Sequence, residues 1–276
     1  MDLQALRDIA RQELIINIRN RWTIIFAVVF CVLVVGVAAA GVLTEGFSGM
    51  QSLTRTSASL LNLVLYIVPL VALVMGTLSF TGDKGSAELL FSQPLSRAEI
   101  IIGKLLGVFL SLVVSTLAGF AVAGGVIVAV GGLEGLGRYA AFVVLALALA
   151  LVFLCLAVLV ATANRRKAKA FGTALFLWFF FVLFYDLLTL GASTFLRGEA
   201  ANTLLFLSLF GNPVDMVRVA TLIILENITI FGAAGAAMLR FLGGPALSIV
   251  LLSAGLLVWV SVPIVIAHRM MRHQDL

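Results

Sequence analysis

The first residues to consider for chemistry are Gly103 and Lys104, which form the only Gly-Lys pair in the chain. A phosphate-binding loop needs the pattern GxxxxGK[ST], whose backbone amides surround the phosphates of ATP. Ala98 stands where that pattern requires its first glycine, and Leu105 stands where it requires serine or threonine. The sequence therefore predicts no ATP-binding loop in this chain.

Metal, redox and hydrolase chemistry also lack their usual patterns. His268 and His273 lie in a polar tail, and the chain contains no HExxH, CxxC or Gly-x-Ser-x-Gly. Cys31 and Cys155 lie singly in apolar runs, where a free cysteine most often serves as a small buried apolar residue. We expect no catalytic residue, no metal ligand and no cofactor in this chain.

Polar and charged residues gather in the segment 82–107, GDKGSAELLFSQPLSRAEIIIGKLLG. Pro94 breaks regular structure there. Ser96 can cap a helix that begins at Arg97, with Glu99 at the third position of the capping box. These residues predict a short, rigid helix at the membrane surface.

The same helix would continue through Gly103 and Gly107, a GxxxG pair that allows another helix to approach closely. A stiff surface helix joined to a spanning helix can pass a push from a soluble partner into the membrane. The residues alone fit an ordinary, well-capped loop equally well.

A second helix start is predicted at Asn212-Pro213-Val214-Asp215. Asparagine is a good N-cap, proline suits the first helical position, and an acid suits the first turn. Arg218 follows one turn later. We expect this helix at the outer face of the membrane, before the last span.

Asp186 lies beside Tyr185 in the outer part of a predicted span. Ionisable residues inside spans are functional candidates by default, because burying a charge in lipid is costly. The alternative is an interface residue near the outer headgroups, paired with Arg197 or water.

The elements that carry these residues follow from composition. Residues of the AVILMFWYC set make up 62% of the chain and charged residues 11%, and the apolar residues form long uncharged runs. Runs of 18 or more can cross the hydrocarbon core, where every backbone polar group must be paired internally, so the runs must be helices. We predict an all-α polytopic membrane protein whose six spans lie at residues 22–43, 60–80, 101–130, 139–161, 170–190 and 246–267.

The remaining segments complete one predicted transmembrane domain over residues 1–276. Residues 1–21 form an amphipathic helix, with Leu6, Ala10 and Leu14 on one side, which can lie in the membrane interface. The alternative is that this helix simply extends the first span. Residues 22–190 hold spans one to five, 191–245 form an outer-face segment, 246–267 form the last span, and 268–276 form a tail.

Lysine and arginine predict the orientation. With both termini in the cytoplasm, thirteen of the basic residues lie inside and five lie outside, as the positive-inside rule requires. The net charge of +5 therefore reports membrane orientation and not a nucleic-acid surface. A seventh span over residues 219–239 stays open, although it would bury Glu226 and Asn227 at a cost of at least ~2.5 kcal/mol for the acid.

The quoted segment 82–107 resembles the loop between the second and third spans of ABC-2 type permeases, which carries the pattern ELLLSxPxSRxxIxxGKxxG and a coupling helix. RDIARQELIINIRNRW resembles the N-terminal interfacial helix of this family. GNPVDMVRVA resembles the NPxDxxR segment of one branch, the NosY-like permeases of nitrous oxide reductase maturation. The resemblance covers the whole chain in length, topology and order of segments.

The resemblance implies a permease homodimer in the bacterial inner membrane that binds two copies of a separate ATPase, which holds ATP and Mg. In the NosY-like branch a periplasmic β-helical copper-handling protein docks on the outer face. The residues implied as the ATPase-contacting element are Pro94, Ser96, Arg97, Glu99, Gly103 and Lys104. Those implied for the outer-face helix, as partner contact or gate, are Asn212, Pro213, Asp215 and Arg218.

Two other functions remain open. The chain could serve an ABC-2 exporter of a drug, lipid or ion, or it could be a secondary transporter that works alone. A secondary transporter would need paired broken helices and several intramembrane charges, and Asp186 is the one candidate charge. The methionines form no ladder of soft ligands across the membrane, which favours a mechanical role over copper conduction.

Overall fold

The computed structural model describes residues 3–45, 49–81, 97–131, 135–164, 166–196, 198–225 and 232–272. Every regular element in these ranges is helical, and six spans are long and apolar enough to cross a membrane. The predicted all-α membrane fold is therefore confirmed. The spans belong to α2 (Arg21–Glu45), α3 (Gly49–Phe80), α5 (Arg97–Gly131), α6 (Leu136–Ala163), α7 with α8 (Lys167–Phe179 and Tyr185–Thr194) and α12 (Pro245–Arg272).

The central helix of the bundle is α6, which packs against α3, α5, α12 and a shorter helix, α10 (Pro213–Ile224). Phe142 and Phe153 of α6 are fully buried. At Gly76 of α3 an added Cβ would lie 2.6 Å from the Cβ of Ala157, so the two backbones approach closely there. Close packing of this kind stabilises the association of spans in lipid, where the hydrophobic effect does not drive helices together.

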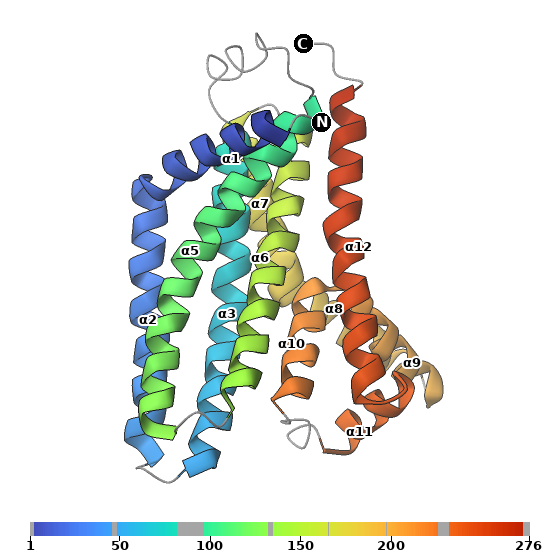
Figure 1. Cartoon of the computed structure of the whole chain (residues 1–276). Coiled ribbons are helices and arrows are strands. Elements are labelled where there is room, and N and C mark those ends of the chain that lie inside the picture. The colour runs from blue at the N-terminus through green and yellow to red at the C-terminus, as the bar shows by residue number, and fades with distance from the viewer. Residues whose placement is uncertain are drawn as a thin grey trace.

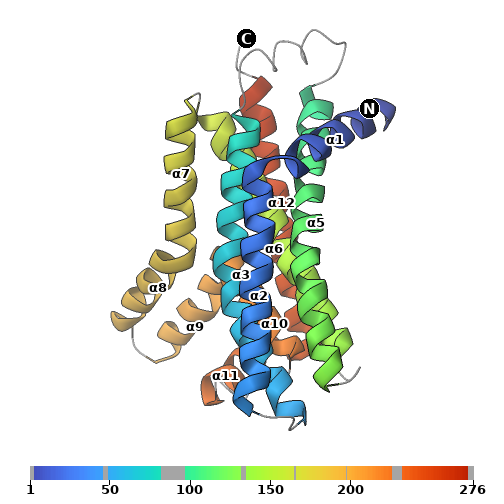
Figure 2. The ribbon, with the colours of Figure 1, turned by 90° about the vertical axis from the view of Figure 1, so that its left-hand side faces the viewer.

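The helix α1 (Leu3–Ile18) crosses one end of the bundle at a large angle to the spans, and it packs along α5 (Figures 1 and 2). The helix is interrupted between α1 and α2, where the side chain of Asn20 accepts a hydrogen bond from the amide of Trp22. The alternative that α1 extends the first span is therefore wrong. The C-terminal end of α12 lies at this same end of the bundle (Figure 1).

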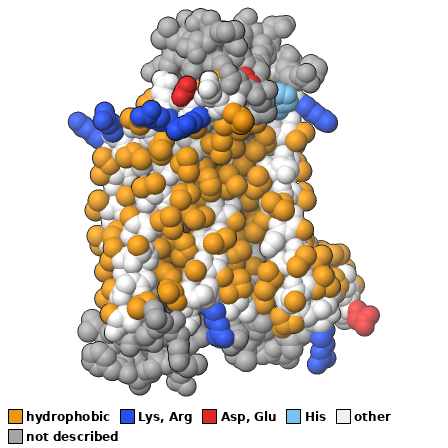
Figure 3. Space-filling view, in the orientation of Figure 1, with side chains coloured by type: hydrophobic (Ala, Val, Ile, Leu, Met, Phe, Trp, Pro, Cys, Tyr) orange, Lys and Arg blue, Asp and Glu red, His pale blue; other side chains and the backbone are white. Residues whose placement is uncertain are grey.

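The distribution of apolar and basic side chains on the outside of the bundle is that of a membrane-spanning protein. Figure 3 shows a continuous apolar band with lysine and arginine at its two edges, and basic side chains form a row beside α1. Under the positive-inside rule the α1 end is the cytoplasmic end. This assignment of sides stays a prediction.

The fifth span changes its winding where α7 meets α8, through a π-helical segment at Phe180–Phe184. Beyond it, α9 (Glu199–Ser208) and a 3-10 turn (Leu209–Gly211) lead into α10, and the chain bends by 103° between the two arms. Together the two arms have the length and apolarity of one broken span or a re-entrant loop. The short helix α11 (Gly232–Phe241) precedes α12.

Several predicted boundaries need correction. Residues 44–59, which separate the first two predicted spans, are largely helical, because α2 continues to Glu45 and α3 begins at Gly49. Hydropathy locates the apolar part of a helix, whereas backbone hydrogen bonding continues past it. Residues 191–245 were predicted as a segment at the outer face, yet α10 begins well inside the bundle (Figure 1). The alternative span over 219–239 lies partly outside the described residues.

Candidate functional site

The predicted ATPase-contacting element is described in part. Pro94 and Ser96 lie outside the described residues. Arg97 begins α5, as predicted, and Glu99 is the acid of its first turn and is buried. The helix then runs without interruption to Gly131, so its first turn and the third span form one rigid element.

The GxxxG pair of α5 packs against α1. A Cβ at Gly103 would lie 2.8 Å from the Cγ2 atom of Ile9. At Gly107 it would lie 2.6 Å from both the backbone oxygen of Ala10 and the Cβ of Glu13. The predicted close helix contact is therefore present, and its partner is α1.

A polar cluster links this contact to two spans. The carboxylate of Glu13 accepts hydrogen bonds from Ser79 Oγ of α3 and, at 2.9 Å, from Asn17 Nδ2. Its other oxygen lies 3.7 Å from Lys104 Nζ, and that ammonium lies 5.7 Å from the ring centre of Phe80. We call Glu13, Asn17, Ser79 and Lys104 the Glu13 cluster. It joins α1, the end of α3 and the second turn of α5.

Of these four residues, the sequence pattern predicts Lys104 as a site residue and does not predict Glu13, Asn17 or Ser79. One signal was available: Glu13 follows Leu6 and Ala10 at helical spacing, so it interrupts the apolar side of α1. An acid at such a position requires a buried partner. Serine at the end of α3 carries no comparable signal, because serine is common wherever helices end.

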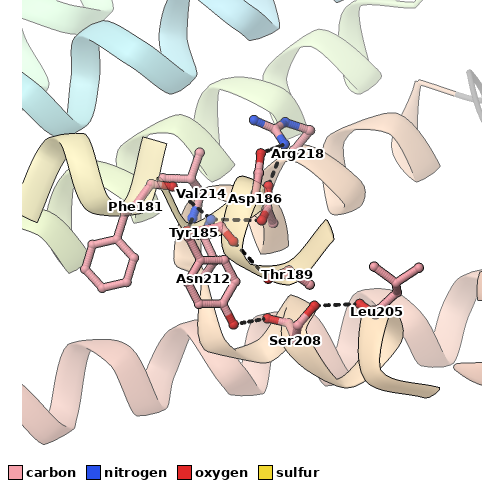
Figure 4. A network of polar contacts seen from close by, with 10 residues as sticks. Phe181, Tyr185, Asp186, Thr189, Leu205, Ser208, Asn212, Val214 and Arg218 are labelled. Atoms are coloured by element: carbon pink, nitrogen blue, oxygen red, sulfur yellow. Dashed lines mark hydrogen bonds and ion pairs between the residues drawn. The ribbon is translucent and has the colours of Figure 1, made fainter. Parts of the chain in front are cut away.

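A second cluster forms where α8 meets α10 (Figure 4). Arg218 Nη1 lies 3.2 Å from Asp186 Oδ2, and the same nitrogen donates to the carboxylate of Asp215. Asn212 Nδ2 donates to Asp215 at 2.8 Å. We call Asp186, Asn212, Asp215 and Arg218 the α8–α10 cluster. The prediction that Asp186 pairs with Arg197 lies outside the described residues, and Arg218 is its observed partner.

Asn212 is the best-enclosed member of this cluster and has no exposed surface. As predicted, it caps α10 and accepts from the amide of Val214 at 3.0 Å, with Pro213 at the first helical position. Its Nδ2 also donates to the carbonyl of Phe181 at 2.9 Å. Phe181 belongs to the π-helical segment, and such segments often mark functional positions in helices. The cap of α10 is therefore fixed to the irregular part of the fifth span.

Two further hydrogen bonds hold the bend between α9 and α10. Tyr185 Oη donates to the carbonyl of Ser208 at 2.6 Å and occupies the space beside Gly211. Trp259 Nε1 of α12 donates to the carbonyl of Phe210 at 3.1 Å. The carbonyl of Ser208 ends α9 and that of Phe210 lies in the 3-10 turn after it, where the end of a helix leaves such groups without internal partners. The bend is thus supported by α8 and α12.

The α8–α10 cluster holds two carboxylates and one guanidinium. The side chain of Asp215 is 15% exposed, that of Arg218 25% and that of Asp186 43%. Charges in such a setting persist because they pair with one another. The geometry suits a polar junction between helices. Among the described residues, no group of three or more His, Cys, Asp and Glu could hold a metal ion.

The comparison with known protein families now decides the class. The family described as ABC-2 family transporter protein matches residues 7–276, which include both clusters. The chain belongs to the ABC-2 family of transporter proteins. ABC permeases of this kind are multi-pass membrane proteins without ATPase activity of their own, and they pair with ATPase subunits.

Two curated relatives of this ABC-2 permease are each called probable ABC transporter permease protein NosY. The protein from Pseudomonas aeruginosa is 34% identical over 275 residues, which cover 97% of this chain and 98% of that protein. The protein from Stutzerimonas stutzeri is 33% identical over 276 residues, with coverage of 97% and 98%. The similarity to these relatives therefore extends over nearly the whole permease.

Proposed function

We propose that this permease couples ATP hydrolysis by a separate ATPase subunit to a conformational change at the opposite face of the membrane, in copper-site maturation of nitrous oxide reductase. The observation that carries this proposal is the similarity to two NosY permeases over nearly the full length of the chain. The NPVDMVR segment, which resembles that branch, supports the same assignment, and its residues form the capped start of α10 and three of the four members of the α8–α10 cluster.

The cytoplasmic half of the proposed mechanism rests on α5. The ATPase would contact Arg97 and the segment before it, and α5 would carry the displacement toward Gly131 without a hinge. The Glu13 cluster would make α1 and α3 follow α5, because hydrogen bonds and an ion pair join all three helices. A displacement of the start of α5 would thus move α1, α3 and α5 together.

The other half rests on α6 and the broken helix pair. α6 packs against α3 and α5 and also against α10 and α12, so it lies between the two clusters. Movement of α3 and α5 would reach α10 through α6, and the α8–α10 cluster would carry it on to α8. We propose that a second copy of the permease and a periplasmic β-helical copper-handling protein complete the assembly, and that the shape change acts on this outer partner.

Purification of the tagged permease in mild detergent, followed by mass spectrometry, tests the assembly. We expect an ATPase subunit and a periplasmic repeat protein to co-purify. An ATPase alone would favour an ABC-2 exporter of a drug, lipid or ion, and the absence of any ATPase would contradict the proposal.

Deletion of the gene in its own host tests the maturation role. We expect nitrous oxide reductase to accumulate with a low copper content, and a plasmid copy of the permease to restore the copper. Full copper occupancy in the deletion strain would contradict this role while leaving the ABC-2 assignment intact.

A further inference from the structure

α1 has two neighbouring stripes along its length. One stripe packs on α5 and includes Ile9 and Ala10, which are 9% and 8% exposed. The other stripe follows at spacings of four, four, three and four residues, so its members share one side of the helix. It consists of Leu3, Arg7, Arg11, Leu14 and Ile18, and we call it the arginine stripe.

Four of the five residues of the arginine stripe are exposed, and Leu14, which borders the side that packs on α5, is half-buried. Leu3 is 80% exposed and Ile18 is 40% exposed, and both arginines are exposed as well. Within the described part of the chain, neither arginine forms an ion pair. The stripe therefore has two cationic groups at its middle and apolar side chains at its ends.

The position of the stripe relative to the bilayer follows from its neighbours. Trp22, at the start of α2, is 66% exposed, and tryptophan prefers the headgroup level of a membrane. Figure 3 shows basic side chains in a row beside α1, along the edge of the apolar band. α1 thus lies at the level of the lipid phosphates.

Most of the exposed charged side chains on and beside this helix are positive. Arg7 and Arg11 of α1, Arg19 of the following turn and Arg21 at the start of α2 are exposed, and Asp8 is the one exposed carboxylate among the described residues of this stretch. The second acid of α1, Glu13, is enclosed in the Glu13 cluster. A basic helix with apolar side chains in the interface complements an anionic lipid surface.

We propose that the arginine stripe binds the headgroups of anionic phospholipids in the leaflet beside α1. Guanidinium groups form paired hydrogen bonds to phosphate oxygens, and Arg7 and Arg11 lie one turn apart, so they can contact one headgroup or two adjacent ones. Leu3, Leu14 and Ile18 contact the upper acyl chains. This inference goes beyond the proposed function and does not depend on it.

Native mass spectrometry of the delipidated permease, without any partner protein, tests the inference. The probes are dioleoyl phosphatidylglycerol and dioleoyl phosphatidylcholine in equal amounts. We expect a clear preference for phosphatidylglycerol, and a loss of about fivefold in that preference for each arginine removed in Arg7→Gln and Arg11→Gln. An unchanged preference in the double variant would overturn the proposal.

The matched control is the double variant Arg166→Gln/Lys169→Gln, which removes two exposed cations at the start of α7. We expect it to keep the preference. An equal loss in this control would show that any two cations suffice and would also overturn the proposal. Arg7→Lys/Arg11→Lys should keep part of the preference, because the charge remains while the planar fork is lost.

A second measurement needs no variant and therefore does not depend on correct folding of one. Photoactivatable phosphatidylglycerol is crosslinked to the unmodified permease, and the labelled peptides are identified. Label on the peptide with residues 3–18 is expected, and label confined to other peptides would contradict the proposal. If the glutamine variant lost its ATPase subunit yet kept its lipid preference, the stripe would be a protein contact instead.

Discussion

The ammonium group of Lys104 lies 3.7 Å from the carboxylate of Glu13, so α1 and the spanning helix α5 share one ion pair. The two side chains are 21% and 14% exposed, which limits screening by water. The same carboxylate accepts a hydrogen bond from Ser79 of α3. This carboxylate is therefore the point where α1, α3 and α5 are held together.

Removal of the Glu13 carboxylate should destabilise the permease. We predict that Glu13→Ala lowers the free energy of unfolding by about 1–3 kcal/mol, because Lys104 and Ser79 lose an enclosed partner. Glu13→Gln should cost less, because its amide oxygen still accepts from Ser79. Thermal unfolding in detergent measures both. An unchanged free energy of unfolding in Glu13→Ala would show that the cluster contributes nothing to stability.

Gly107 should not tolerate a side chain. An added Cβ would lie 2.6 Å from the backbone oxygen of Ala10, and backbone cannot move aside as a flexible side chain can. We predict that Gly107→Ala destabilises the permease and loosens α1. Gly125 of the same helix is the matched control, because an added Cβ meets nothing within 4 Å there.

Gly125→Ala should be neutral or stabilising by up to about 1 kcal/mol, because alanine favours the helix over glycine. Limited proteolysis between α1 and α2, together with thermal unfolding, compares the two variants. Equal behaviour of Gly107→Ala and Gly125→Ala would contradict the close contact between α1 and α5.

The ion pair between Asp186 and Arg218 should show measurable coupling. We predict about 0.5–1 kcal/mol from a double-mutant cycle with Asp186→Asn and Arg218→Gln, a modest value because Asp186 is 43% exposed. Arg218→Gln alone should cost more than Asp186→Asn alone, because it also leaves the more enclosed Asp215 without its cation. Additive effects would show that the two residues do not interact.

Asn212 should be hard to replace. We predict that Asn212→Ala costs about 2–4 kcal/mol, because it removes the cap of α10 and leaves the buried carbonyl of Phe181 without its donor. Asn212→Ser keeps a capping oxygen and should recover part of the loss. Equal unfolding midpoints for the alanine and serine variants would show that capping is not the reason.

Features that depend on a short stretch of neighbouring residues could be predicted from the sequence. The six spans follow from apolar runs, and the start of α10 follows from the Asn212-Pro213 cap. The GxxxG pair predicted a close contact, although the partner helix α1 could not be known from spacing alone.

Other features depend on contacts between distant segments. The pairing of Asp186 with Arg218 requires α10 to turn back into the bundle beside α8, and the 103° bend that does this carries no pattern beyond the cap. The π-helical segment at Phe180–Phe184 consists of apolar residues with no breaker, so its sequence resembles an ordinary span. Ser79 likewise acquires its role only through the position of α1.

ATP hydrolysis by the purified complex with Arg97→Glu tests whether the start of α5 couples the ATPase to the membrane helices, with Arg240→Glu at the opposite end of the bundle as its control. We predict that Arg97→Glu leaves the thermal unfolding of the permease unchanged but lowers ATPase binding or the coupled activity severalfold, whereas Arg240→Glu changes neither. If Arg97→Glu retained full ATPase binding and coupled activity, the assignment of the α5 start as the coupling element would be wrong.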